Sequence, residues 1–330
     1  MRSLVNRQYQ PKAWEWRLLV LIVLPPVLSW FASWHWLLDV LTSFVPYYLL
    51  ACLLGAVWWV WRRFIGLALL CLIVSAVMAV QIGLAMSPSL GTPVATAPTI
   101  KVAQFNISLL NPNLPAFFSW LNRKHADTDI VVLLEAGPAL TPLLASMKSH
   151  YPYQSMQLDD SPFGIAMLSR LPDTHLELVN DSFPYIEAQV NIAGRTLHVI
   201  GVHPPPPISG SLTQARNHQL QQLAQRVSRQ APDSVIVVGD FNITPWSPWY
   251  RRFLEESGLH AANQQWQPTW APYSSEHWRL VPIDLTFHSD KVNLLARQVG
   301  PAFESDHRVV ISTWQLSARV VTDSITWPSE

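Results

Sequence analysis

Cysteine is nearly absent from this 330-residue chain. Its two cysteines, Cys52 and Cys71, both lie in apolar stretches near the N-terminus. The long polar remainder therefore has no disulfide framework, no cysteine-based zinc site and no cysteine nucleophile. The lack of disulfides does not decide the compartment in which the chain works.

An excess of basic residues is also absent. Residues 101–330 carry 16 Lys+Arg against 20 Asp+Glu, and the formal net charge of the whole chain is zero. A domain that binds nucleic acid through non-specific electrostatics usually has a strong positive excess. Charge therefore gives no support for nucleic acid as a partner, which stays open only because a bound metal can offset phosphate charge locally.

Charge of either sign almost disappears between residues 18 and 85, where the charged residues are Asp39, Arg62 and Arg63. Three apolar runs lie there, at 18–38, 43–61 and 64–85. Each is close to the ~20 helical residues that a hydrocarbon core of ~30 Å requires. The pattern predicts a membrane anchor at 1–85 with three transmembrane helices. A signal peptide followed by core helices is the alternative, and three runs in tandem disfavour it.

The basic residues near these runs predict an orientation. They precede the first run or separate the second from the third: Arg2, Arg7, Lys12, Arg17, Arg62 and Arg63. Basic residues favour the cytoplasmic side. We therefore expect an integral protein of a bacterial inner membrane, with a cytoplasmic N-terminus and a periplasmic or otherwise extracytoplasmic C-terminal domain. A transporter is disfavoured because the centres of the runs hold no ionisable residue.

A proline-containing linker at 86–99 leads into the polar part, which we expect to fold over 100–316 and to end in a tail at 317–330. Short β-rich runs alternate there with helical patterns. The expected strands are 100–106, 130–135, 164–169, 185–192, 196–203, 234–242, 283–287 and 308–316. The expected helices are 114–125, 138–148, 212–230 and 247–257. This alternation predicts a layered α/β (α+β) domain with mixed sheets.

Polar side chains that suit catalysis follow or interrupt the expected strands. They are Asn106, Glu135, His203, Asp240, Asn242, Asp284, Asp306 and His307. Ends of neighbouring strands converge on one edge of a sheet, where α/β folds generally place sites. Carboxylates and amides suit Mg²⁺ or Mn²⁺, and histidines can hold protons beside them, a combination that fits phosphoester hydrolysis. Taken singly, Glu135 could be a solvated strand end, and 239–242 could be an ordinary turn.

As an ordered set, these motifs resemble the endonuclease/exonuclease/phosphatase family over about 100–316. The motifs are Gln104-Phe105-Asn106, Leu133-Leu134-Glu135, Gly201-Val202-His203, Gly239-Asp240-Phe241-Asn242, Ile283-Asp284 and Ser305-Asp306-His307. The resemblance implies a four-layer sandwich of two mixed β-sheets flanked by helices, and a metal-dependent hydrolase acting on phosphoester bonds.

The resemblance also implies a metal site. Glu135 would be the principal ligand, with Asn106 beside it. Asp306 would assist in positioning the metal or the water. The expected ion is Mg²⁺, with Mn²⁺ as an alternative.

The remaining roles concern the phosphate. Asp240 would orient or deprotonate the attacking water, and Asn242 would bind a phosphate oxygen. His307 would contact the scissile phosphate, with Asp284 fixing its tautomer and charge. His203 would lie near the leaving group.

The sequence leaves several alternatives open for the substrate and the activity. A nuclease is slightly favoured; a sphingomyelinase-like phosphodiesterase acting on phospholipid headgroups is the competitor, and a catalytically silent membrane scaffold is the third possibility. One departure from the family pattern is Pro282, which replaces an expected arginine and leaves Arg279 as a substitute. Arg216 and Gln219 either face the site or belong to a solvated helix face. No protein partner can be inferred.

Overall fold

The computed structural model describes residues 10–86, 93–94, 97–230, 234–262, 266–272 and 280–317. Arg279, most of the expected linker and the expected tail beyond Ser317 lie outside these ranges. The chain forms two compact units, which we call the helical unit and the sandwich unit. The helical unit is Met1–Met86 with Ile243–Arg251, and the sandwich unit is Ser87–Asn242 with Arg252–Glu330.

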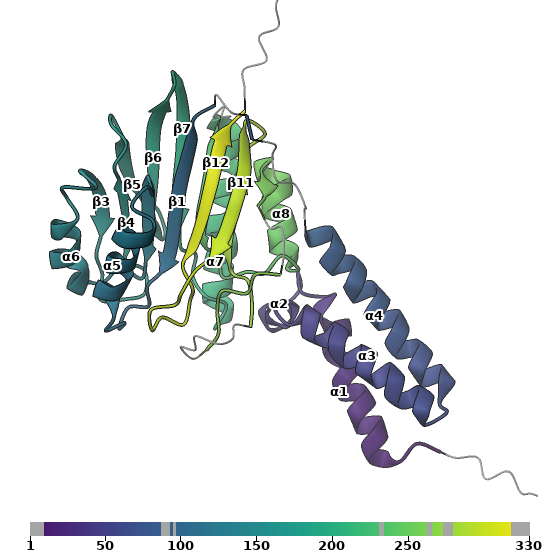
Figure 1. The fold of residues 1–330 in the computed structure, drawn as a ribbon. Coiled ribbons are helices and arrows are strands. Elements are labelled where there is room, and N and C mark those ends of the chain that lie inside the picture. Colours follow the sequence, from purple (N-terminus) through teal and green to yellow (C-terminus); the bar gives the residue numbers. More distant parts are fainter. Residues whose placement is uncertain are drawn as a thin grey trace, which may run out of the picture. The chain divides into compact units, whose positions relative to one another are not determined.

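The helical unit contains four helices (Figure 1), namely α1 Ala13–Ser29, α2 Trp36–Thr42, α3 Val45–Trp61 and α4 Ile65–Ala85. Their lengths differ from the three predicted spans. Only α4 is long and apolar enough to cross a membrane by itself, and α2 with α3 would make a second span if that pair, bent by 68°, is counted as one. The prediction of three transmembrane helices is therefore wrong for the described residues.

The first predicted span fails because the helix breaks inside it. α1 ends at Ser29, and α2 starts after His35, whose Nδ1 accepts a hydrogen bond of 3.2 Å from the Leu37 N–H. This cap begins a new helix near the end of the apolar run 18–38. The average hydrophobicity of a run does not detect such a break.

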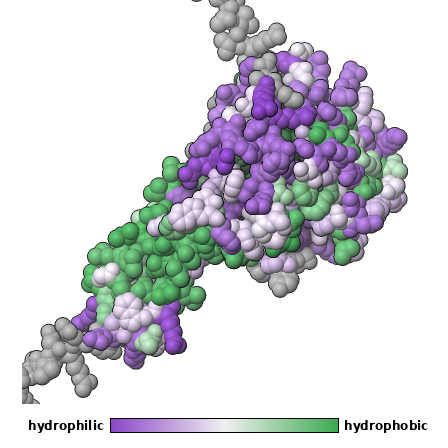
Figure 2. Space-filling view, turned by 180° about the vertical axis from the view of Figure 1, so that it is seen from behind, coloured by the Kyte–Doolittle hydropathy of each residue, from purple (hydrophilic) through white to green (hydrophobic). Residues whose placement is uncertain are grey.

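The surface of the helical unit is nonetheless strongly apolar. Large side chains such as Leu21, Val57 and Leu84 are 70%, 69% and 81% exposed. Figure 2 shows an apolar surface over much of the visible face of these helices. Apolar surface of this extent is typical of a protein–protein or membrane contact.

The segment Ile243–Arg251 packs with the helices, although it is distant from them in sequence. The Trp246 side chain is buried in a cluster with Val45, Cys52, Val74 and Met78. The buried Asp39 carboxylate accepts a hydrogen bond of 2.7 Å from the Ser247 hydroxyl. Sequence periodicity gives no signal of this association.

The sandwich unit consists of two six-stranded sheets (Figure 1). The first sheet has the order β11-β12-β1-β2-β4-β3 and the second β5-β6-β7-β8-β10-β9. Its strands are β1 Thr99–Asn106, β2 Ile130–Leu134, β3 Tyr153–Gln157, β4 Ile165–Ser169, β5 His175–Asn180, β6 Pro184–Ile192, β7 Arg195–Val202, β8 Val235–Asp240, β9 His260–Ala261, β10 Asp284–His288, β11 Val292–Val299 and β12 Val310–Leu316. Both sheets are mixed, because β1–β2 and β7–β8 are parallel and the other pairs antiparallel.

Apolar layers between the two sheets and beneath the helices of the first sheet hold the sandwich together. The inner faces of the two sheets meet in one core that includes Val132 and Met167 of the first sheet and Val199 and Val238 of the second. The outer face of the first sheet is covered by helices, as is that of the second. The helices of this unit are α5 Leu114–Lys124, the 3₁₀ turn η1 Pro138–Leu140, α6 Thr141–Ser146, α7 Gly210–Gln230 and α8 Pro248–Ser257, whose first turn belongs to the helical unit. The four-layer prediction is confirmed.

Candidate active site

The strand register brings the predicted site residues to one edge of the sandwich. In the first sheet, Asn106 pairs with Leu134, so Glu135 follows directly beside it. In the second sheet, Val202 pairs with Gly239, which places His203 next to Asp240. Asp240 in turn pairs with Asp284 across the antiparallel β8–β10 ladder.

Asn106 links the two sheets at this edge. Its Nδ2 donates hydrogen bonds to Glu135 Oε1 at 3.0 Å and to Asp240 Oδ2 at 3.1 Å. Asn106 is fully buried, and Asp240 is 1% exposed. A buried amide held between two carboxylates fixes their separation, because each lost contact would leave a buried polar group unsatisfied.

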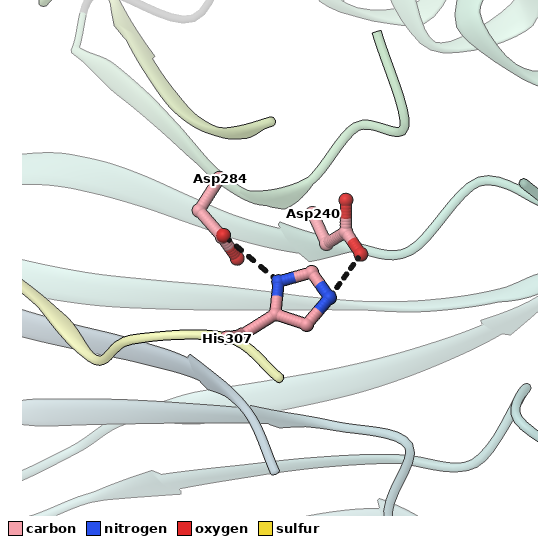
Figure 3. A group of neighbouring side chains, drawn as sticks. All are labelled: Asp240, Asp284 and His307. Atoms are coloured by element: carbon pink, nitrogen blue, oxygen red, sulfur yellow. Dashed lines mark hydrogen bonds and ion pairs between the residues drawn. The ribbon is translucent and has the colours of Figure 1, made fainter. Parts of the chain in front are cut away.

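His307 lies between the two aspartates of the second sheet (Figure 3). Its Nδ1 is 2.9 Å from Asp284 Oδ2, and its Nε2 is 3.5 Å from Asp240 Oδ2. Burial alone would lower the pKa of His307, but the charges of Asp284 and Asp240 outweigh burial and raise that pKa to about 10. The ring therefore carries a proton at neutral pH, which suits contact with an anionic phosphate.

His203 approaches the same carboxylate from another strand. Its Nε2 is 3.5 Å from Asp240 Oδ2. Burial opposes protonation, but the contact with Asp240 raises the pKa of His203 above its usual value. For Asp240, burial works to raise the pKa, and the two histidines overcome it, so the net shift is downward. Asp240 therefore stays ionised and can accept a hydrogen bond from a water molecule.

The backbone at this edge adopts left-handed or sterically tight conformations. Glu135 and Asn242 have φ values of 56° and 51°, in the left-handed region. Gly239 has a φ of 155°, and a Cβ there would lie 1.9 Å from the Val202 carbonyl oxygen. Only glycine fits such an approach, and it lets β8 deliver Asp240 beside β7.

Two further residues of the predicted site, Asn242 and Asp306, form hydrogen bonds outside the cluster around Asp240. The Asn242 amide donates to the Pro204 carbonyl oxygen at 2.9 Å. Asp306 Oδ2 accepts a hydrogen bond of 3.0 Å from the indole Nε1 of Trp270. The neighbouring Ser305 hydroxyl donates to the Asn106 carbonyl oxygen at 2.8 Å and so attaches this loop to the site.

Two residues of α7 support the site from behind. The solvated-face alternative for Arg216 and Gln219 is wrong, because they are only 1% and 3% exposed. Arg216 Nη1 donates to the Asn242 carbonyl oxygen at 2.9 Å, and Gln219 Nε2 donates to the Phe183 carbonyl oxygen at 3.1 Å. Both therefore hold backbone beside the site. The sequence alone did not indicate that Trp270 would donate a hydrogen bond to Asp306.

The donor set fits a hard divalent cation. Asp240, Asp284 and His307 offer atoms within 4.8 Å of one another, and Asp284 Oδ1 is buried without a hydrogen-bond partner in the described part of the chain. We do not count His307 among the predicted ligands, because its Nδ1 lies 2.9 Å from Asp284 Oδ2 and its Nε2 lies 3.5 Å from Asp240 Oδ2. Oxygen atoms from carboxylates and amides are what Mg²⁺ prefers, so Asn106, Glu135 and Asp306 stay the predicted ligands.

Comparison with known proteins decides the family. A model described as the Endonuclease/Exonuclease/phosphatase family matches residues 103–307, more than half of the chain. The chain belongs to this family. Endonuclease/exonuclease/phosphatase enzymes hydrolyse phosphoester bonds and use divalent metal ions, and this chain is one of these hydrolases.

Solved structures of the endonuclease/exonuclease/phosphatase fold resemble the sandwich unit. D. rerio TDP2 complexed with single strand DNA product is 18% identical, with a TM-score of 0.51, covering 66% of this chain and 98% of that one. The human Nocturnin catalytic domain is 21% identical, with a TM-score of 0.50 and coverage of 68% and 97%. Sphingomyelinase C from Streptomyces griseocarneus is 20% identical, with a TM-score of 0.47 and coverage of 66% and 99%. The likenesses to TDP2 and Nocturnin show the fold alone. No curated protein matches the sequence.

Proposed function

We propose that the chain is a membrane-anchored, Mg²⁺-dependent phosphoesterase that hydrolyses a phosphodiester, or a phosphomonoester, by attack of a metal-activated water. One observation carries the proposal: Asp240 Oδ2 lies within 3.1 Å of the Asn106 amide and 3.5 Å from both His203 and His307. A single ionised oxygen thus lies among the groups expected to hold the metal, the phosphate and the leaving group.

Each residue has a part that follows from its charge. When bound, the metal would polarise the phosphoryl group and neutralise the charge that develops on it. Glu135, Asn106 and Asp306 would hold that ion. Asp240 stays ionised and would orient the attacking water.

The phosphate itself would meet the protonated groups. His307 carries its proton at neutral pH because of Asp284, so it would bind a phosphate oxygen as a cation. His203 would lie on the leaving-group side, where a raised pKa favours donating a hydrogen bond. Asn242 would add an amide contact to the phosphate.

The apolar helical unit supports the membrane part of the proposal. We infer that α4, with or without the bent α2–α3 pair, anchors the chain in a bilayer, and that the basic residues near the N-terminus face the cytoplasm. The sandwich unit would then work on the extracytoplasmic side of a bacterial inner membrane.

Nucleic acid and phospholipid headgroups remain the competing substrates. The fold shared with a TDP2 structure that holds a single strand DNA product favours a nuclease slightly. The anchor favours a phospholipid, because it would keep the site near a bilayer. No protein partner is proposed.

A substrate panel tests the proposal. The full chain in detergent micelles would be incubated with single- and double-stranded DNA, RNA, sphingomyelin and a phosphomonoester, each with Mg²⁺, Mn²⁺ or EDTA. We expect one phosphoester class to be cleaved with metal and none with EDTA. Asp240→Ala should abolish that cleavage. Asp173→Asn is the matched control, because Asp173 is exposed and follows β4 at the opposite edge of the sheet. Full activity of the Asp240 variant would refute the assignment.

A further inference from the structure

Two phenylalanines lie beside His203 at the active edge and have no role in the proposed chemistry. The rings of Phe163 and Phe183 contact each other with centroids 4.6 Å apart at 55°. The Phe163 ring lies 6.5 Å from the His203 ring. Both phenylalanines are partly exposed, and neither belongs to the core between the sheets or to the core beneath α5. Their position is therefore not explained by packing of those cores.

The backbone fixes both rings at the site. Phe163 directly precedes Gly164, whose carbonyl oxygen accepts a hydrogen bond of 2.9 Å from the N–H of Ala136, the residue after Glu135. A Cβ on Gly164 would lie 2.1 Å from the Ala136 carbonyl oxygen, so this approach is close. The loop that carries Phe163 is thus held against the end of β2.

Phe183 reaches the same place from the second sheet. Tyr185 pairs with Val202, which puts Phe183 at the end of β6 that lies beside His203. The Gln219 side chain holds the Phe183 carbonyl oxygen at 3.1 Å. The ring pair therefore joins the two sheets on the His203 side of the site.

One polar atom beside these rings lacks a hydrogen-bond partner. His203 is 4% exposed, and its Nδ1 has no hydrogen-bond partner among the described residues. A buried donor without a partner is costly and often marks a place where a ligand or water completes the contact. The site beside the phenylalanine pair thus combines an apolar wall with one buried polar atom that lacks a hydrogen-bond partner among the described residues.

We propose that Phe163 and Phe183 form a wall on which a planar ring of the substrate, such as a nucleobase, packs beside the scissile phosphate. The proposal rests on the proposed phosphoesterase function. Phenylalanine can recognise such a ring only through its face and edge, and stacking on an aromatic side chain accepts any base.

Charge and geometry favour a short nucleotide segment. The excess of acidic over basic residues in 101–330 gives no electrostatic track for a long polyanion, so contacts next to the scissile phosphate must supply more of the binding. A quaternary ammonium headgroup usually needs several aromatic faces around the cation. Here the two rings contact each other and leave no gap between them for a cation.

Matched dinucleotides give the test. The substrates are thymidylyl-thymidine and two analogues in which either the 5′ or the 3′ base is replaced by hydrogen, with sphingomyelin as the headgroup arm. For the wild-type chain, removing one of the two bases should lower kcat/KM about 5- to 150-fold, the range expected for loss of one stacked base. Phe163→Ala should bring that ratio close to one while changing kcat/KM for the matching abasic analogue little.

Two variants separate stacking from general damage. Phe163→Tyr keeps an aromatic face and should keep the base preference. Ile208→Ala removes an apolar side chain that is 72% exposed in the turn after His203 and should leave the preference unchanged. An equal loss on all dinucleotides, an unaltered ratio, or a selective loss on sphingomyelin would each overturn the stacking wall.

Failure of the proposed function gives a different result. If the wild-type chain cleaves sphingomyelin but no dinucleotide, the phosphoesterase stands and the stacking wall is wrong. If it cleaves neither these substrates nor any other member of the substrate panel, the proposed phosphoesterase is wrong. The wall is then judged by calorimetry with thymidine 5′-monophosphate and deoxyribose 5-phosphate: equal affinities would overturn it, and a nucleotide preference lost in Phe163→Ala would support it.

Discussion

The indole Nε1 of Trp270 donates a hydrogen bond of 3.0 Å to Oδ2 of Asp306, so a residue outside the family motifs orients a predicted metal ligand. Trp270→Phe removes this hydrogen bond and keeps an aromatic ring. Partners that orient metal ligands typically contribute 10- to 100-fold to metal affinity. We expect the variant to need about 10-fold more Mg²⁺ for half-maximal activity, and to bind Mn²⁺ correspondingly more weakly in calorimetry.

The maximal rate at saturating metal separates positioning from damage. It should stay within about threefold of wild type if Trp270 only orients Asp306, because the groups around Asp240 are untouched. Unchanged metal affinity would mean that Asp306 does not hold the ion.

The Asp284–His307 pair makes a prediction about pH. The His307 pKa in the folded chain is about 10, against an ordinary value of 6.5. The proton on His307 therefore stabilises the folded state. This contribution is complete below about pH 6.5 and is lost as the pH rises towards 10. Asp284→Asn removes the largest charge that holds the proton, so it should lower the His307 pKa and shift the alkaline limb of kcat/KM to lower pH.

Two measurements check this shift. Thermal unfolding in EDTA should show the wild-type chain losing stability between neutral pH and pH 10, and Asp284→Asn losing less. The rate at neutral pH should fall about 10²- to 10³-fold, the usual loss when one group that stabilises the transition-state charge is removed. Identical pH profiles for the two proteins would exclude a protonated His307 from the reaction.

Much of the site was predictable because the relevant pattern is local. Asn106, Glu135, His203 and Asp240 each follow or end a short apolar run, and parallel strands carry such ends to one edge. The sandwich followed from the same runs together with the family resemblance. No local pattern predicts the Trp270–Asp306 contact, which joins residues 36 positions apart in the chain.

The membrane part was predicted less well for a physical reason. Composition measures how apolar a run is, but a span also needs an unbroken backbone. The break between α1 and α2 and the bend between α2 and α3 depend on caps and turns that composition ignores. The burial of Trp246 among the helices is likewise a tertiary association without a sequence period.

Gly239 makes a prediction about stability. Gly239→Ala would place a Cβ 1.9 Å from the Val202 carbonyl oxygen, at a φ of 155°. The backbone must move, and strain of this kind costs about 1–3 kcal/mol or more. We expect a lower melting temperature by circular dichroism and a loss of activity, because Asp240 is the next residue. Gly258→Ala is the matched control: its φ is also positive, at 70°, but nothing lies within 4 Å of its Cβ. Equal destabilisation of both variants would contradict the steric argument.

Glu135 distinguishes an enzyme from a silent scaffold. Its Oε1 accepts from Asn106 and its Oε2 from the Leu109 N–H, both at 3.0 Å, so the carboxylate is held in place before any ion binds. Glu135→Gln keeps the size and removes the charge, and it can keep only one of these two contacts because its amide nitrogen cannot accept a hydrogen bond. We expect Mn²⁺ binding to weaken at least about 10-fold in calorimetry and hydrolysis to fall with it, because a carboxylate is a far better ligand for a hard cation than an amide.

Glu177→Gln on β5 is the control, since Glu177 lies in an edge strand of the second sheet and should leave binding unchanged. Binding that is absent from the wild-type chain would favour the scaffold, whereas binding equal in both proteins would move the ion away from Glu135 and refute the ligand assignment.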